Sequence, residues 1–304
     1  MTLPDPSPQY IRAALLRTGL VAAGDDLRID PRDGRTAAHL GSDRMAWFPH
    51  DEEARHLLAR ERRVLRLIER YCRFKAPRVF HEDADGWDVR AKVPGLTAPF
   101  DYYDWVVDDP AFARRLGDAL GRILADQHTS VPASELAGWL PSAPDWPRAQ
   151  DIPSLPAVVS DAALLRRIDR ALARHVEIRR DLSDPVLIHG DLGLHNMAFD
   201  AATDALNGLF DYEGAAYGDR HQDFKYLPLI VGNHPDALLD GAIAAYESLA
   251  GVQIDRDRVR LLNATAAIAF LGFRFGHAPE EEWCGRTLAQ DLAWSTGALD
   301  AAGF

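Results

Sequence analysis

The sequence predicts an α+β fold of two lobes: a small N-terminal lobe built on an antiparallel sheet, and a larger, mainly helical C-terminal lobe. Short extended segments separated by turn residues dominate the first part of the chain, and helical hydrophobic patterns dominate the rest. The step Val93-Pro94-Gly95 separates these regions, because proline and glycine interrupt regular structure. We therefore expect the lobes to span residues 1–94 and 95–304, with a hinge between them.

In the small lobe, a short amphipathic helix over residues 8–20 is expected before the sheet. Asp33-Gly34, between the extended segments LRIDPR and TAAHLG, is a strong hairpin signal, and Ser42-Asp43 leads to a third strand, RMAWFP. Residues 51–71 carry leucine, valine and isoleucine at helical spacing. The segments PRVFHED and WDVRAKVPG then flank a turn at Ala84-Asp85-Gly86, which completes the sheet.

In the large lobe, helical patterns cover residues 109–129, 160–182, 235–250 and 256–300. A short hairpin region is expected between them, formed from the segments VLIHGD, MAFD and LNGLFDYEG. The stretch 139–156 is rich in proline and tryptophan, so we expect it to be a surface connection between helices.

Composition narrows the class of protein. The 304 residues are 47% hydrophobic and carry a net charge of −12, which supports an ordered globular chain and disfavours general nucleic-acid binding. No apolar run approaches the roughly 20 residues that span a bilayer, and the start, MTLPDPSPQY, does not resemble a signal peptide. The two cysteines, Cys72 and Cys284, suit a reducing compartment. We expect a cytoplasmic protein with neither nucleic-acid nor membrane partners, and its oligomeric state stays open.

The segment that carries chemistry lies between residues 186 and 224. The apolar run Val186-Leu187-Ile188 leads into His189-Gly190-Asp191, and Asn196 follows five residues after Asp191. A second apolar run ends at Asp211. Catalytic groups commonly stand where a buried strand passes into a loop. Phosphoryl transfer needs a carboxylate for the attacking hydroxyl and oxygen ligands for Mg²⁺, and Asp191, Asn196 and Asp211 supply such a set.

These residues carry a family resemblance. HGDLGLHN resembles the catalytic loop of aminoglycoside phosphotransferases and related protein-kinase-like small-molecule kinases, and FDYEGAAYGDRHQDF resembles the segment that follows it. The resemblance implies a bilobal protein-kinase-like fold with ATP or GTP, the phosphoryl donor, between the lobes. It also implies that Asp191 is the catalytic base and that Asn196 and Asp211 hold Mg²⁺. His189 and Asp223 are expected to brace the catalytic loop.

The resemblance extends into the small lobe. LLARERRVL resembles the helix whose glutamate, Glu61 in this chain, pairs with a lysine that contacts the nucleotide. VRAKVPGLTA resembles the hinge segment, so Ala91 and Val93 are expected beside the adenine. Gly34, Arg35 and Thr36 are expected near the phosphates, although they fit an ordinary hairpin turn equally well.

The chain departs from the pattern on the third strand. Kinases of this type place a lysine or arginine there, and this chain has Trp47. Three explanations stay open: Arg35 or Arg44 reaches the phosphates, Trp47 stacks on a base while Mg²⁺ alone neutralises charge, or the chain is a pseudokinase. The intact set of Asp191, Asn196 and Asp211 favours an active enzyme. The departure leaves Glu61 without its expected partner.

The acceptor is expected to be a small molecule with a hydroxyl group. A cationic antibiotic of aminoglycoside type is the leading class, because Glu213, Asp219, Glu280 and Glu281 could bind ammonium groups. The acidic run that contains Glu280 fits a solvated helix start better than an ammonium site, because acids favour helix N-termini. The alternatives are a metabolic kinase for an amino alcohol, sugar or homoserine-like acceptor, and a nucleotide-binding pseudokinase.

Overall fold

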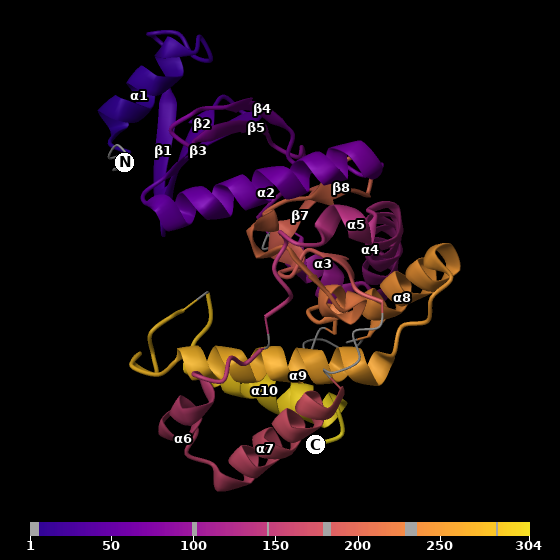
Figure 1. The fold of residues 1–304 in the computed structure, drawn as a ribbon. Helices are drawn as coiled ribbons and strands as arrows, with labels where there is room; N and C mark the ends of the chain where they lie inside the picture. Colours follow the sequence, from indigo (N-terminus) through magenta and orange to yellow (C-terminus); the bar gives the residue numbers. More distant parts are fainter. Residues whose placement is uncertain (1–5, 99–101, 145, 179–183, 229–235, 284) are drawn as a thin grey trace.

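The computed structural model of the chain describes residues 6–98, 102–144, 146–178, 184–228, 236–283 and 285–304. A small lobe with an antiparallel sheet stands above a larger helical lobe (Figure 1). The fold class predicted from the sequence is therefore confirmed, including the order of strands and helix in the small lobe.

The small lobe is built on a five-stranded antiparallel sheet in the order β1-β2-β3-β5-β4. Its strands are β1 (Leu27–Arg32), β2 (Arg35–Leu40), β3 (Arg44–Pro49), β4 (Val79–Glu82) and β5 (Asp88–Ala91). The predicted turn before β2 is present, and Gly34 takes a φ of +69°, which favours glycine over residues with a Cβ. Helix α1 (Pro8–Arg17) shares a hydrophobic core with one face of the sheet.

The register of the strands decides which side chains face away from that core. Trp47 on β3 pairs directly with Ala37 on β2 and with Asp88 on β5. Side chains that are directly opposite in a sheet share a face, and neighbours along a strand alternate. Arg35, Trp47, Asp88 and Arg90 therefore lie on one face, whereas Phe48 faces the core with α1. The charged face is the one that helix α2 contacts.

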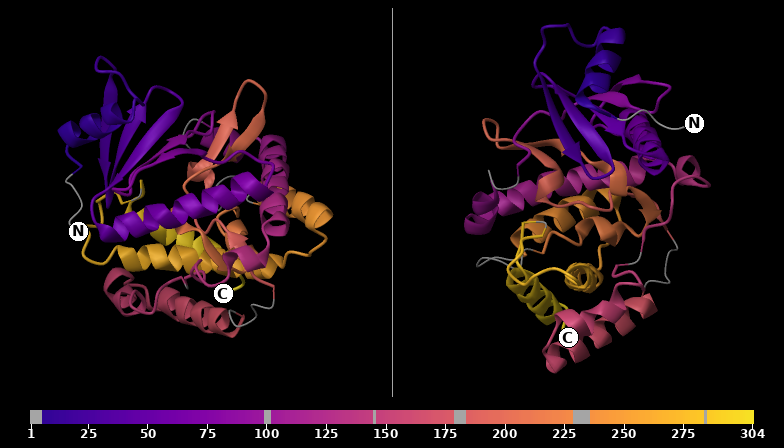
Figure 2. Two further views of the ribbon diagram at one scale, coloured as in Figure 1. Left: turned by 45° about the horizontal axis from the view of Figure 1, so that its top comes forward. Right: turned by 90° about the vertical axis from the view of Figure 1, so that its left-hand side faces the viewer.

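Helix α2 (Glu52–Tyr71) links the two lobes. Its N-cap is Asp51, whose carboxylate accepts a hydrogen bond from the Ala54 amide at 2.8 Å. The apolar residues of its second half, from Val64 to Ile68, pack into the core of the large lobe. Figure 2 shows the helix between the sheet and the helical region from two further sides. A division at residue 94 stays a prediction, and α2 ties the two lobes together across it.

The large lobe is mainly helical. Its helices are α3 (Tyr103–Asp108), α4 (Pro110–Ser130), α5 (Ala133–Leu136), α6 (Leu155–Val158), α7 (Ala162–Ile178), α8 (Ala237–Ala250), α9 (Arg256–Phe273) and α10 (Leu288–Ala301). The stretch 139–156 is largely irregular, as predicted. The helix predicted over 256–300 is wrong, because α9 and α10 are separate. Gly276, with a φ of +89°, and Pro279 lie between them, and Arg274 fastens the loop through a 2.7 Å ion pair with Asp291.

Short strands carry the predicted functional segment. β6 (Val186–Ile188) pairs with β9 (Ala216–Gly218), and β7 (Met197–Asp200) forms a hairpin with β8 (Ala205–Leu209). Single turns of 3₁₀-helix connect them: η3 (Leu194–Asn196), η4 (Tyr212–Gly214) and η5 (Arg220–Phe224). Each predicted catalytic residue thus stands just beyond the end of a short strand or within the turn that follows it.

Within the described residues, no helix combines the length and apolar character needed to cross a membrane. The Cys72 thiol is free, and burial raises its pKa to about 12. Cys284 lies outside the described residues.

The packing of α4 against α8 gives a test of the fold. A Cβ placed on Gly121 would lie far inside van der Waals contact of the Ala242 carbonyl oxygen. We expect Gly121→Ala to lower the free energy of unfolding by about 1–3 kcal/mol through overpacking, although alanine favours helix over glycine. Gly24→Ala, in open space with an ordinary φ, is the control. Urea unfolding measures both, and a Gly121→Ala protein as stable as the parent would contradict this packing.

Candidate active site

The loop after β6 is held by one buried carboxylate, that of Asp223 at the end of η5. Its oxygens accept hydrogen bonds from the amides of His189 at 2.9 Å and Gly190 at 3.0 Å. His128 lies 3.1 Å from the same carboxylate. Burial alone would raise the pKa of Asp223, but the hydrogen bond and charge of His128, with His189 and the Gly190 amide, lower it below its usual value. Asp223 is therefore an ionised group that fixes the loop backbone.

Gly190 brings two distant segments together. Its φ is +86°, and a Cβ there would collide with the carbonyl oxygen of Gly214. Only glycine lets the loop that carries Asp191 pass this close to the turn that follows Asp211. The sequence contains this signal, a glycine directly before the predicted base, but its steric reason needs the structure.

Asp191 and Asn196 are linked within the loop. The side-chain nitrogen of Asn196 donates a hydrogen bond to the Asp191 backbone carbonyl at 2.8 Å. This leaves the side-chain oxygen of Asn196 available as a ligand. The Asp191 carboxylate lies 3.2 Å from the His195 ring, and its side chain is 50% exposed. Burial would raise the pKa of Asp191, but the hydrogen bond to His195 and the charges of His195, His189 and Lys225 lower it. The carboxylate can therefore accept a hydrogen bond from an incoming hydroxyl.

Asp211 follows β8 in a left-handed conformation, with a φ of +63°. Such a backbone is uncommon outside glycine, and it is retained only where the surroundings impose it. The preceding residue is fixed on both sides: the Phe210 amide donates to the Asn196 carbonyl at 3.1 Å, and the His189 ring lies 2.9 Å from the Phe210 carbonyl. His189 thus braces the loop from Asp191 against the segment that holds Asp211.

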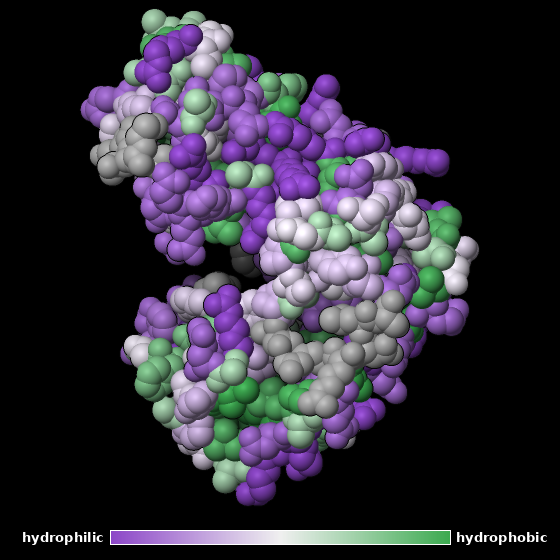
Figure 3. Space-filling model, viewed as in Figure 1, coloured by the Kyte–Doolittle hydropathy of each residue, from purple (hydrophilic) through white to green (hydrophobic). Residues whose placement is uncertain are grey.

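A pocket of about 520 Å³ lies beside these residues. Its lining includes both carboxylates, Asp191 and Asp211, together with Glu213 and the buried Lys225. Figure 3 shows a hollow between the two lobes on the side where the sheet and the α9–α10 loop face each other. Among the described residues, the predicted base and one predicted metal ligand therefore open into the same space.

Part of the pocket wall is aromatic. Trp146 and Tyr226 line it, and they contact a group of half-buried rings from α9, α10 and the loop between them. We call this group the aromatic cluster: Trp146, Tyr226, Phe270, Phe273, Trp283 and Trp294. Ring centroids are 5.6 Å apart for Trp146 and Phe273 and 5.3 Å apart for Phe270 and Trp294. This apolar wall was not predicted from the sequence.

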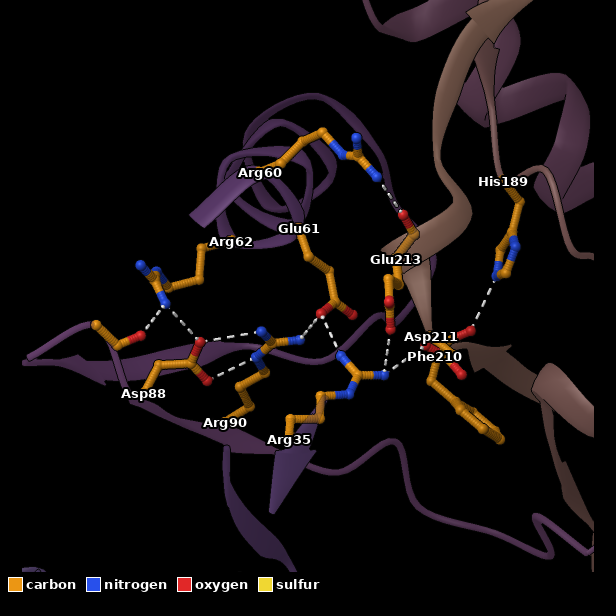
Figure 4. A network of polar contacts seen from close by, with 11 residues as sticks. Arg35, Arg60, Glu61, Arg62, Asp88, Arg90, His189, Phe210, Asp211 and Glu213 are labelled. Atoms are coloured by element: carbon orange, nitrogen blue, oxygen red, sulfur yellow. Dashed lines mark hydrogen bonds and ion pairs between the residues drawn. The ribbon is translucent and has the colours of Figure 1, made fainter. Parts of the chain in front are cut away.

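On the small-lobe side, Arg35 meets three carboxylates. Its guanidinium lies 2.7 Å from Glu213, 3.3 Å from Asp211 and 3.4 Å from Glu61 (Figure 4). The same guanidinium stacks over the ring of Trp47, 4.2 Å from the ring centroid. Trp47 therefore contacts a cation from the neighbouring strand.

Glu61 has partners, contrary to the expectation that Trp47 leaves it without one. Besides Arg35, it pairs with Arg90 on β5 at 2.7 Å. Arg90 also binds Asp88, and Asp88 pairs with Arg62 of α2 at 3.0 Å. This network was not predicted from the sequence, because its members come from β2, β5 and α2 and meet only through the register of the sheet. The available signal was Asp88 and Arg90, two residues apart on a short strand, facing the charged helix.

Two residues expected near the phosphates face elsewhere. The Thr36 side chain is buried and its hydroxyl lies 2.9 Å from the His50 ring, because alternation along β2 places it opposite to Arg35. Arg44 likewise lies on the opposite face from Trp47, and its nearest carboxylate is Asp43 at 3.9 Å. Of these cations, only Arg35 reaches the predicted catalytic segment.

The acids expected to bind the acceptor are scattered. Glu213 lines the pocket, but Asp219, Glu280 and Glu281 do not. Asp219 pairs with Arg258 and His221, both at 2.6 Å. Burial would raise its pKa, but these two partners lower it to about 2. Glu280 is exposed, and Glu281 pairs with His277 in the α9–α10 loop.

The hinge expected to meet a base follows β5. The Ala91 amide donates to the Arg78 carbonyl at 2.8 Å, which engages it in the sheet. Val93 is buried, and its backbone has no hydrogen-bonding partner among the described residues. Two residues on, Gly95 passes against Phe199, and Leu96 pairs with Phe199 through two hydrogen bonds of 2.6 and 2.9 Å. The strand of the small lobe is thus anchored to β7 just beyond the hinge.

The donor set fits Mg²⁺ rather than a transition metal. The oxygens of Asn196 and Asp211 are hard ligands, and Mg²⁺ takes few protein ligands when phosphates and water complete its shell. No group of three or more His, Cys, Asp or Glu side chains in the described part of the chain could hold a metal alone.

Comparisons with known proteins identify the family and the fold. The model of the phosphotransferase enzyme family matches residues 29–262. A search of curated proteins gave no significant match. Among solved structures, the GDP complex of wild-type aminoglycoside 2'-phosphotransferase-IIIa is similar, with a TM-score of 0.66 and 16% identity over 97% of each chain.

Macrolide 2'-phosphotransferase MphH from Brachybacterium faecium is similar too, with a TM-score of 0.63 and 18% identity over 97% of this chain and 98% of that one. At these identities the likeness establishes the fold. The family match covers most of the sequence, including all strands of the small lobe except the first two residues of β1. This chain therefore belongs to the phosphotransferase enzyme family and has the bilobal protein-kinase-like fold.

Proposed function

We propose that this phosphotransferase transfers the γ-phosphoryl group of ATP or GTP to a hydroxyl of a small molecule. The proposal rests on one observation. Asp223 holds the backbone of the loop that carries Asp191, and Asp191 lines the pocket beside Asp211. In this proposal Asp191 is the base and Asp211 a metal ligand, and both face the space in which the acceptor and the phosphates would meet.

The chain's own residues have distinct parts in this reaction. Asp191 accepts the hydrogen bond of the acceptor hydroxyl, orients it, and takes its proton as the phosphoryl group leaves the nucleotide. Asn196 and Asp211 would hold Mg²⁺, which neutralises charge on the phosphates. Val93 offers its free backbone groups to the base of the nucleotide, next to Ala91. Gly34 lies at the turn that covers the phosphates.

The acceptor side favours a molecule with an apolar face. Trp146 and Tyr226 of the aromatic cluster form part of the pocket wall, and only Glu213 of the acids expected to bind ammonium groups lies there, already paired with Arg35. Similar structures include complexes named for kanamycin and streptomycin, as well as macrolide phosphotransferases. Of these two antibiotic classes, the wall suits a macrolide-like ring better than an aminoglycoside polycation.

Substitution of the two pocket carboxylates tests the chemistry. Asp191→Asn should lower kcat by about 10²–10⁴-fold, since the base is lost, while the Kd for the Mg²⁺–nucleotide complex stays unchanged. Asp211→Asn should raise the Kd of the Mg²⁺–nucleotide complex and reduce the dependence of nucleotide binding on Mg²⁺. Asp118→Asn, on the exposed face of α4, is the control. Steady-state kinetics and calorimetry measure both effects. Wild-type turnover by Asp191→Asn would refute the assignment, and nucleotide binding without any transfer by the parent would indicate a pseudokinase.

A panel of acceptors tests the substrate class. Macrolides, aminoglycosides, amino alcohols, sugars and homoserine are each incubated with nucleotide, and products are scored by mass. We expect phosphorylated macrolide, and Trp146→Ala should raise the KM of that acceptor without changing the KM of the nucleotide. Glu281→Gln should leave both values unchanged. If Glu281→Gln raises the acceptor KM and Trp146→Ala does not, ammonium binding by the α9–α10 loop is the correct explanation.

A further inference from the structure

The cleft face of the small-lobe sheet carries two arginines, one on each strand beside β3. Arg35 on β2 and Arg90 on β5 flank Trp47, because the register pairs β3 with both strands. The cation expected on the third strand is therefore missing from this face of β3, since Arg44 lies on the opposite face, and the two neighbouring strands each present a guanidinium here. The question is which of the two is available to a ligand.

Arg90 is fully engaged in the protein. It is 3% exposed, and it pairs with Glu61 at 2.7 Å and with Asp88 at 2.7 and 2.9 Å. Asp88 in turn receives Arg62 from α2. Every charged side chain in this group lies beside one of opposite charge. Arg90 therefore holds α2 against the sheet and stays paired with these carboxylates.

Arg35 is placed differently. Its side chain is 12% exposed, and two of its three carboxylates, Asp211 and Glu213, belong to the catalytic segment of the other lobe. Glu61 is already neutralised by Arg90. One guanidinium thus faces a surplus of negative charge at the place where Mg²⁺ and phosphates are proposed to bind.

We propose that Arg35 is the phosphate-side cation of this enzyme, moved from the third strand to the second. This inference rests on the proposed function, because Arg35 can act in this way only when a nucleotide is bound between the lobes. Without nucleotide, Arg35 bonds to Asp211 and Glu213. When the nucleotide and Mg²⁺ bind, Asp211 turns to the metal and the guanidinium bonds to the phosphate oxygens. Glu61 and the ring of Trp47 keep the guanidinium in place throughout.

Trp47 has a defined part in this arrangement. A flat ring under a flat guanidinium holds it in one orientation, and the planar fork of donors matches two phosphate oxygens at once. The ring also fills the space that a long side chain on β3 would take. Trp47 is therefore a positioning residue for Arg35, and it is not expected to stack on the base.

The test compares ligands that differ in their phosphates. Calorimetry measures the binding of adenosine, ADP and ATP, each with Mg²⁺, to the parent, Arg35→Ala and Arg35→Lys. We expect Arg35→Ala to weaken ADP and ATP binding by at least about tenfold, the size of a lost charge-assisted hydrogen bond, and to leave adenosine binding unchanged. The affinity of Arg35→Lys for ADP and ATP should lie between those of the parent and of Arg35→Ala, because lysine keeps the positive charge but lacks the planar fork of donors. If Arg35→Ala does not fold, Arg35→Lys carries the comparison.

Two further variants sharpen the result. Arg32→Ala is the matched control, since Arg32 also lies over Trp47, at 5.5 Å, but pairs with Asp30 on its own strand. The double variant Arg35→Ala/Trp47→Lys returns a cation to β3, and it should regain part of the lost ATP affinity.

Three results would overturn the proposal: equal losses for adenosine and ATP, no loss in Arg35→Ala while the parent binds ATP, or a phosphate-dependent loss in Arg32→Ala instead. A parent protein that binds no nucleotide would refute the proposed function itself.

Discussion

The site depends on one buried carboxylate. Asp223 is fully buried, and burying a charge is costly unless hydrogen bonds and opposite charges compensate it. The two amides of the catalytic loop and His128 provide that compensation. The hydrogen bonds that stabilise the buried carboxylate are therefore the same ones that fix the backbone of the loop. Gly190 then allows the loop to pass against Gly214, and the predicted base and metal ligand open into one pocket.

The small lobe is joined to this site mainly through helix α2. Its middle carries Glu61 and Arg62, which bind the charged face of the sheet, and the apolar residues that follow pack into the core of the large lobe. The helix thus belongs to both lobes, and a shift of one lobe would have to move buried ion pairs or buried apolar side chains. Arg35 adds a second connection, since its partners come from both lobes.

The sequence predicts the fold class and a candidate catalytic loop because those signals are local. Asp191 and Asn196 lie within one short motif, and the hairpin turn at Gly34 needs only its own dipeptide. The network of Glu61, Arg90 and Asp88 could not be predicted, since it depends on the register between strands and on the face that α2 covers. The same holds for Asp219, whose partner Arg258 lies in another helix, and for the aromatic cluster, whose rings come from separate segments. The helix expected over 256–300 is too long, because composition alone does not reveal the ion pair between Arg274 and Asp291 that holds the loop between α9 and α10.

The buried position of Arg90 has a consequence for alkaline conditions. Burial alone would lower the pKa of Arg90, but the carboxylates of Glu61 and Asp88 raise it above its usual value. A group whose pKa is higher in the folded than in the unfolded state stabilises the folded state until the solution is basic enough to remove its proton. The ion pairs that hold helix α2 against the sheet through Arg90 therefore persist in basic solution, and the alkaline limit of the fold is set by other groups.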